Sequence, residues 1–300
     1  MDEMILGGYG DDAATVKKGG GSIVWYPGHM TAAKRSLQKS LSLVDFAIEL
    51  LDARIPVSSQ NPDFKSLCAG KPILTLLSKA TLADEKKTQR FITELEKSGR
   101  TVIAIDSKTM LNYGKITPAI KSLLSEKLER YAAKGMAGRK IRGMVIGVTN
   151  VGKSTFINSF TGTNKAKAED RPGVTRSTQW IAAPNGIELL DTPGLLWHKF
   201  DDPAVGEKLA FTGAIRDEIL DLAGLAVRLT GLLAREYTDL LEQRYKISIK
   251  DKELEPFEIF ELIAKKRGFI LRGNEIDYDR CAVCVLDEFR GGKIGRITLD

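Results

Sequence analysis

A glycine-rich loop in the middle of the chain carries the residues best suited to bind phosphate. The stretch GVTNVGKS, residues 147–154, has the spacing G-x-x-x-x-G-K-S between an apolar run and a helix-like segment. Gly147 and Gly152 allow backbone amides to surround phosphate oxygens. Lys153 supplies a positive charge, and the Ser154 hydroxyl suits Mg²⁺. A chance match in a glycine-rich loop is the alternative, but the flanking strand and helix favour a true phosphate site.

Two further segments extend this site toward a third phosphate group. IELLDTPGLL places Asp191 at the end of an apolar run, where a carboxylate can hold Mg²⁺ through water, and the Gly194 amide can meet a γ-phosphate. Between the two motifs, DRPGVTRSTQW puts Thr175 on a loop that contains Pro and Gly. Thr175 is either a turn residue or a switch that binds Mg²⁺ only when the γ-phosphate is present.

The segment LLSKATLAD lies closer to the N-terminus. It is typical of a loop that reads a guanine base, except that two of its expected residues are replaced. Such loops usually have the sequence Asn-Lys-x-Asp after a strand. Lys79 keeps its place here, whereas Ser78 and Thr81 replace the Asn and the Asp. A neutral hydroxyl at position 81 lacks two charged acceptor oxygens, which predicts weaker binding of GTP and poorer discrimination against ATP. Asp84 has the wrong spacing to substitute.

A second base-side loop is predicted at AIDSKT, residues 104–109, where Ser107 and Lys108 follow another apolar run. Both base-side segments precede the phosphate loop, whereas in ordinary GTPases they follow it. A parallel sheet tolerates this order, because a ligand binds at the carboxyl ends of the strands whatever the order in which the chain forms them. A fold tolerates circular permutation when its chain ends lie close together.

The elements that must position these loops alternate through the first two hundred residues. VDFAIELL, PILTLL, TVIAI, RGMVIG, TQWIAA and IELL indicate six strands, with helical stretches such as 83–98 and 116–134 between them. This alternation predicts an α/β fold with a mostly parallel six-stranded sheet and helices on both faces. From about residue 203 the pattern is helical only. We therefore expect a flexible tail over 1–22, a nucleotide-binding domain over 23–202 and a helical domain over 203–300.

Composition and charge narrow the class of partner. Of the 300 residues, 43% are hydrophobic and 28% are charged, which is normal for a globular protein with a core. No apolar run is long enough to span a bilayer, the N-terminal stretch lacks a secretory signal, and three cysteines fit a reducing cytoplasm. Residues 1–202 carry a net charge of +8 and residues 203–300 a net charge of −2. The basic first part favours an anionic partner, although a solvated basic surface gives the same count.

The sequence resembles the circularly permuted GTPases of ribosome assembly, specifically the ribosome biogenesis GTPase A (YlqF-like) group. The residues that carry the resemblance are WYPGHM, DARIP, GVTNVGKS, DRPGVT, LLDTPGLLW and LDEFRGGKIGRITLD. The resemblance extends over nearly everything after residue 22. The resemblance implies a permuted GTPase domain, a C-terminal helical domain that docks on ribosomal RNA, and a cytoplasmic, monomeric protein that acts late in maturation of the large ribosomal subunit. Its cofactors would be GTP or GDP with Mg²⁺.

The resemblance also assigns roles by position. Asn150, Val151, Gly152, Lys153, Ser154 and Thr155 would form the phosphate site, with Ser78, Lys79, Thr81, Ser107 and Lys108 on the base side. Ser154, Thr175 and Asp191 would hold Mg²⁺, while Thr175 and Gly194 would act as switches. Asn150 resembles the asparagine of GTPases that K⁺ activates, and such an ion would stabilise charge on the transferring phosphoryl group.

Activation of the attacking water requires a separate residue. Many GTPases have a glutamine after the second switch glycine, but Leu195 occupies that position here and cannot orient water. The resemblance assigns this role to His29 in PGHM, and a histidine near its ordinary pKa could orient or deprotonate water. On sequence alone, a helix cap or a packing role is the favoured interpretation of His29. His198, beside Trp197, is the weaker candidate.

Three functions remain distinguishable by experiment. The leading one is a slow GTPase switch, with Lys153 and Thr175 in its catalytic set, that the ribosomal particle stimulates. The second is an RNA-binding assembly factor with weak nucleotide binding and no efficient hydrolysis. The third is a P-loop NTPase of relaxed base choice, because the base-reading loop is Ser-Lys-Ala-Thr. RNA contacts are expected from Lys265-Lys266-Arg267 and from Arg290 to Arg296, with helix-end cations as the alternative role.

Overall fold

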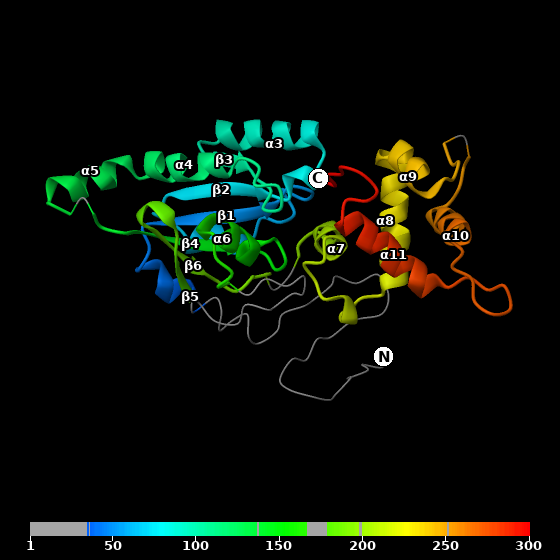
Figure 1. Cartoon of the computed structure of the whole chain (residues 1–300). Helices are drawn as coiled ribbons and strands as arrows, with labels where there is room; N and C mark the ends of the chain where they lie inside the picture. Colours follow the sequence, from blue (N-terminus) through cyan, green and yellow to red (C-terminus); the bar gives the residue numbers. More distant parts are fainter. Residues whose placement is uncertain (1–34, 36, 137, 167–178, 198–199, 251) are drawn as a thin grey trace, which may run out of the picture. The chain divides into compact units, whose positions relative to one another are not determined.

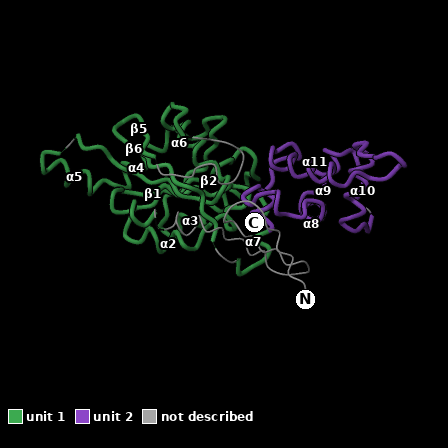
Figure 2. Tube along the Cα trace, turned by 90° about the horizontal axis from the view of Figure 1, so that it is seen from below, with its two compact units in different colours: residues 1–206, 298–300 green, residues 207–297 purple. Residues whose placement is uncertain are grey.

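The computed structural model describes residues 35, 37–136, 138–166, 179–197, 200–250 and 252–300. The chain divides into two compact units, residues 1–206 with 298–300, and residues 207–297 (Figure 2). Each unit has its own core. Among the described residues, no helix has the length and apolar character that crossing a membrane requires.

Within the described residues, six strands form one sheet in the first unit (Figure 1). They are β1 (Phe46–Asp52), β2 (Ile73–Ser78), β3 (Thr101–Ala104), β4 (Ile141–Gly147), β5 (Gln179–Ala182) and β6 (Ile187–Asp191). Their order is β3-β2-β1-β4-β6-β5, and every neighbouring pair is parallel except β5 with β6. This confirms the mostly parallel six-stranded sheet that the apolar runs predicted.

Helices connect and cover these strands. In the first unit they are α2 (Pro62–Leu67), α3 (Glu85–Lys97), α4 (Ile116–Leu123), α5 (Ser125–Ala133) and α6 (Lys153–Thr161), with the 3₁₀ turns η1 (Ala80–Leu82), η2 (Tyr113–Lys115) and η3 (Pro184–Gly186). α6 packs on β4, β5 and β6, whereas α3 packs on β3 and α4 on β2. The apolar side of α3, including Phe91 and Leu95, covers a buried cluster around Leu51 and Leu77, so burial of that face holds the helix on the sheet.

The second unit is helical. Its elements are α7 (Pro203–Phe211), which begins in the first unit, and η4 (Asp217–Ile219), α8 (Leu222–Glu236), α9 (Thr238–Tyr245), α10 (Pro256–Arg267) and α11 (Tyr278–Arg290). α8 packs against α10 and α11. Its buried residues Leu225, Leu229 and Leu233 recur every four positions, which places them on one face of the helix. The helical periodicity after residue 203 is therefore confirmed.

The last three residues return to the first unit. The Leu299 amide donates to the Arg54 carbonyl at 2.7 Å, and the Thr298 hydroxyl donates to the Ala53 carbonyl at 3.1 Å. The Asp300 side chain accepts hydrogen bonds from the backbone amides of Val57 and Ser58 at 2.6 and 2.9 Å. The segment thus fixes the loop that follows β1.

This segment also contacts the start of α3. The Thr298 hydroxyl accepts a hydrogen bond from the Asp84 amide at 3.1 Å, and the Thr298 carbonyl accepts one from Lys87 Nζ at 2.8 Å. Asp84 is the N-cap of α3, and its Oδ1 accepts from the Lys87 amide at 3.0 Å. Residues 298–300 therefore connect the loops after β1 and β2, and Asp84 serves as a helix cap.

Candidate nucleotide site

The predicted phosphate and base-side loops lie at one edge of the sheet. The phosphate loop follows β4, the loop with Gly194 follows β6, and the two base-side loops follow β2 and β3. Because these four strands are parallel, their carboxyl ends share an edge, which is where open α/β sheets bind ligands. The sheet therefore brings together segments that are more than one hundred residues apart in the chain.

The phosphate loop requires its glycines for steric reasons. A Cβ atom on Gly147 would lie 2.7 Å from the Leu50 carbonyl oxygen and 2.9 Å from Val151 Cγ1, so no larger residue fits. Gly152 precedes α6 with a φ of 101°, in the region that favours glycine. Because α6 begins at Lys153, the first backbone amides of this helix lack partners within it and face the loop, an arrangement suited to an anion.

Lys153 is buried at the centre of this loop. Its Nζ donates to the Gly147 and Val148 carbonyl oxygens at 3.2 and 2.8 Å. The pKa of Lys153 is lowered to about 8, mainly by burial and in smaller part by the nearby charge of Lys79, while the charge of Asp191 opposes the shift. A phosphate group would stabilise the protonated form of this amine, so the loop is suited to bind an anion rather than a neutral ligand.

Asp191 and Ser154 provide oxygen donors for a divalent cation. The Ser154 hydroxyl donates to Asp191 Oδ2 at 3.1 Å. Asp191 Oδ1 is buried and meets no hydrogen-bond donor in the described part of the chain. Burial raises the pKa of Asp191, while Lys153 and the Ser154 hydroxyl oppose the rise. An unsatisfied carboxylate oxygen beside a hydroxyl fits Mg²⁺, which prefers oxygen ligands.

The segment after β6 packs directly on the phosphate loop. A Cβ atom on Gly194 would lie 2.6 Å from Thr149 Cα and 2.9 Å from Lys153 Nζ. The Leu195 amide donates to the Gly147 carbonyl at 3.3 Å, and the Leu195 side chain is buried in the core. Leu195 is therefore unsuited to orient water, as its residue type predicts.

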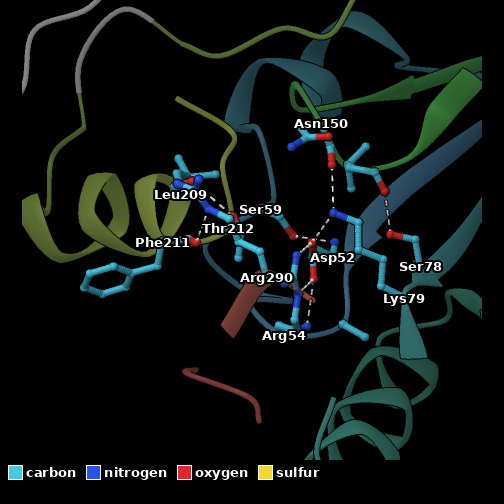
Figure 3. Close-up of polar contacts among 12 residues, drawn as sticks. Asp52, Arg54, Ser59, Ser78, Lys79, Asn150, Leu209, Phe211, Thr212 and Arg290 are labelled. Carbon is cyan, nitrogen blue, oxygen red and sulfur yellow. Dashed lines mark hydrogen bonds and ion pairs between the residues drawn. The ribbon is translucent and has the colours of Figure 1, made fainter. Parts of the chain in front are cut away.

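Ser78 and Lys79 connect the base-reading loop to the phosphate loop (Figure 3). The Ser78 hydroxyl lies 2.7 Å from the Val151 carbonyl and 3.0 Å from the Leu51 carbonyl, and its single proton can serve only one of them at a time. Lys79 Nζ donates to the Asn150 carbonyl at 2.8 Å. The serine therefore takes a bracing position between the two loops, with one donor hydrogen.

Asp52 forms an ion pair with Lys79. Its Oδ2 lies 3.0 Å from Lys79 Nζ and 2.7 Å from Arg54 Nη2, and Arg54 Nε donates to Oδ1 at 2.9 Å (Figure 3). Asp52 and Arg54 are almost fully buried. Burial would raise the pKa of Asp52, but Arg54 and Lys79 hold it well below its ordinary value. Sequence reasoning did not assign these two residues a role in the site, although an acid and an arginine two positions apart after an apolar strand are a detectable signal.

Thr81 has a partner that sequence reasoning also missed. Its hydroxyl donates to Asp106 Oδ2 at 2.5 Å. Asp106 follows β3, is 4% exposed, and accepts from the Lys108 and Thr109 amides through Oδ1 at 2.8 and 3.1 Å. Thus the two base-side loops are joined by a threonine and a carboxylate.

The second base-side loop is also fixed to the helix that follows the phosphate loop. The Ser107 hydroxyl lies 2.7 Å from the Tyr113 hydroxyl, and the Ser107 carbonyl accepts from the Ser159 hydroxyl at 3.3 Å. Ser159 belongs to α6, and Thr155, the third residue of the same helix, is exposed. His29, Thr175 and His198 lie outside the described residues, so their predicted roles are not addressed by the structure.

Two basic residues of the predicted RNA-binding clusters make internal ion pairs in the helical unit. Arg267 Nη2 donates to Glu288 at 2.9 and 3.1 Å. Arg290 donates to the Phe211 carbonyl and pairs with Asp217 at 2.7 Å. These arginines stabilise the helical unit, because each neutralises a carboxylate and one also satisfies a carbonyl.

The fold and the site define a P-loop GTPase whose base-side strands precede the phosphate loop. Residues 142–264 match the family described as 50S ribosome-binding GTPase. Ribosome biogenesis GTPase A of Bacillus cereus is 42% identical over 93% of this chain and 93% of its own length. Its counterpart in Thermotoga maritima is 31% identical over 92% and 93%. The chain belongs to the ribosome biogenesis GTPase A family.

Two solved YlqF structures are also similar to this chain. A structure of GDP-bound YlqF has a TM-score of 0.62 and 27% identity, with 88% of this chain and 97% of that chain covered. A structure of GNP-bound YlqF from T. maritima has a TM-score of 0.60 and 26% identity, over 90% and 97%. As a member of this family, the chain is a GTP-binding and GTP-hydrolysing ribosome assembly factor.

Proposed function

We propose that this chain is a guanine-nucleotide switch that acts in late maturation of the large ribosomal subunit. The observation that carries the proposal is the hydrogen bond between the Ser78 hydroxyl and the Val151 carbonyl at 2.7 Å. It joins a base-side residue to the phosphate loop, so one nucleotide can engage both parts at once. The base would lie beside Lys79, Thr81, Ser107 and Lys108, with its phosphates on the loop from Asn150 to Thr155.

Mg²⁺ would be held by Ser154 and Asp191, with Thr175 joining them when the γ-phosphate is bound. The unsatisfied Asp191 Oδ1 supports this assignment. When bound, Mg²⁺ neutralises negative charge on the β- and γ-phosphates. Lys153 contributes a second positive charge there, and the Gly194 amide donates to the γ-phosphate. K⁺ at Asn150 is a further proposal, tested by comparing hydrolysis in K⁺ and in Na⁺ at equal ionic strength.

Water activation is assigned to His29. The buried Leu195 side chain leaves the usual water-orienting position without a polar group, which supports this assignment. We expect His29→Ala to reduce turnover by about a hundredfold, the typical loss for an acid–base group, with little change in GTP affinity. A His29→Ala protein with normal turnover would exclude this role.

The partner of the switch would be a large-subunit precursor and its ribosomal RNA, met by a monomer in the cytoplasm. The family supports a ribosomal partner, and the net charge of +8 on residues 1–202 supports an anionic one. Lys266 and Lys293, which are exposed in the helical unit, are the better choices for RNA contacts there. Charge reversal at both should weaken particle binding and reduce its dependence on salt.

The deciding experiment measures GTP hydrolysis with and without purified large subunits, using Lys153→Ala as the inactive control. We expect low basal turnover that the particles increase. Particle binding without any GTP turnover would instead indicate an RNA-binding factor with weak nucleotide binding. Equal competition by ATP and GTP would indicate an NTPase of relaxed base choice.

A further inference from the structure

The pair of Thr81 and Asp106 has a defined direction. The Thr81 hydroxyl is the donor and Asp106 Oδ2 the acceptor, at 2.5 Å, because an ionised carboxylate cannot donate. Asp106 cannot turn away easily, since its Oδ1 accepts from the Lys108 and Thr109 amides and the side chain is 96% buried. The proton of Thr81 is therefore held toward Asp106.

A hydroxyl without such a partner can either donate a hydrogen bond to a base or accept one from it. It can accept from the N1–H and N2–H₂ groups of guanine, and it can equally donate to a ring nitrogen or a carbonyl of another base. Once its proton is committed to a carboxylate, only its lone pairs remain for a ligand. A hydroxyl that donates to a charged acceptor also becomes a stronger acceptor itself. Thr81 is only partly buried, so the residue is not closed off from a ligand.

We propose that Asp106 is a specificity-determining positioning residue, which holds the Thr81 proton so that the Thr81 oxygen acts as an acceptor for the guanine N1–H or N2–H₂ groups. The proposal rests on the proposed nucleotide site and names how that site reads its base. The missing carboxylate at position 81 is thereby replaced by two residues, one from each base-side loop. Guanine selectivity should then exceed what the sequence Ser-Lys-Ala-Thr predicts.

We call the proposed series of hydrogen bonds from guanine through Thr81 to Asp106 the relay. The substitution Asp106→Asn tests the direction of these hydrogen bonds without changing the size of the side chain. The Lys108 and Thr109 amides require an acceptor, so the asparagine oxygen should face them and its NH₂ group should face Thr81. Thr81 would then accept from the asparagine and point its own proton outward. An outward donor repels the guanine amino group, whereas it matches xanthine, which carries a carbonyl oxygen at that position.

The experiment measures the affinities of GDP and xanthosine diphosphate by calorimetry for four full-length proteins: the natural chain, Asp106→Asn, Thr81→Val and the double variant. For Asp106→Asn we expect about tenfold weaker GDP and about tenfold tighter xanthosine diphosphate, the effect of one hydrogen bond each. Thr81→Val should also reduce the preference for GDP, and adding Asp106→Asn to it should change the preference no further. Thr109→Val, an exposed threonine of the same loop, is the matched control and should leave the preference unchanged.

The possible outcomes distinguish failure of the relay from failure of the proposed nucleotide site. If Asp106→Asn and Thr81→Val change both affinities by the same factor, or change neither, the relay is wrong although the nucleotide site stands. If Asp106→Asn does not fold, Thr81→Val alone decides, because loss of GDP preference supports the relay and an unchanged preference overturns it. If the natural chain binds neither nucleotide, or Lys153→Ala binds both normally, the proposed site and the relay fail together.

Discussion

The phosphate side and the base side of this site are built by different means. The phosphate side consists of backbone amides, glycines and one lysine, and every position of its motif is present. The base side consists of side chains, and two of its three expected residues are replaced. On the phosphate side, an added Cβ would collide with backbone at Gly147 and Gly194. On the base side, the Thr81 hydroxyl donates to Asp106, and we propose that these two side chains share the role of the missing acid.

The largest effect should come from Lys153→Ala on the phosphate side. The variant loses the only lysine within the phosphate loop, so nucleotide binding should weaken strongly and turnover should fall by at least a hundredfold. The fold should survive, because removing a buried amine also removes its desolvation cost. Calorimetry and a phosphate-release assay measure both effects. Normal phosphate release by a folded variant would contradict the assignment of this loop.

Gly194→Ala should have the next largest effect, because it disturbs the phosphate side by steric contact alone. The new methyl group would lie 2.6 Å from Thr149 Cα, so the segment after β6 must move away from the phosphate loop. We expect turnover to fall by roughly tenfold or more, since a misplaced γ-phosphate contact affects the transition state. Gly114→Ala is the control, because a Cβ there meets nothing within 4 Å. Equal turnover in the two variants would exclude the close contact.

On the base side, Thr81→Asp should fail to restore the usual base-reading residue. A carboxylate at position 81 would face Asp106 Oδ2, which lies 2.5 Å from the present hydroxyl, and two like charges would repel each other. GDP affinity should therefore fall by about tenfold in Thr81→Asp and recover in Thr81→Asp with Asp106→Asn, which carries a single carboxylate. Tighter GDP binding by Thr81→Asp alone would show that Asp106 does not face this position.

The smallest effect concerns pH. The pKa of Lys153 is lowered to about 8, so the free protein loses this positive charge as the pH rises through 8. Bound phosphate favours the protonated amine, and nucleotide affinity should therefore be constant below pH 7.5 and fall by up to tenfold per unit above pH 8. Calorimetry with GDP from pH 7 to 9 measures this, and phosphate groups with a pKa near 6 do not change charge there. Affinity that rises with pH would contradict the predicted sign.

The fold and the phosphate side could be predicted from sequence because both depend on local patterns. Each strand is a short apolar run, and the phosphate loop is one continuous motif between a strand and a helix. The contacts of Thr81 with Asp106 and of Lys79 with Asp52 could not be predicted, because they join residues 25 and 27 positions apart through neighbouring strands. Nor could the internal ion pairs of Arg267 and Arg290, since a charge in a sequence does not reveal its partner.

The return of residues 298–300 to the first unit has a mechanical consequence. Residues 207–297 are attached to the nucleotide-binding unit by two covalent connections, at residue 206 and at residue 298. The second connection ends on the loop that holds Arg54 and on Asp84, the N-cap of α3. A load on the helical unit would therefore reach the loops after β1 and β2 through the covalent chain itself.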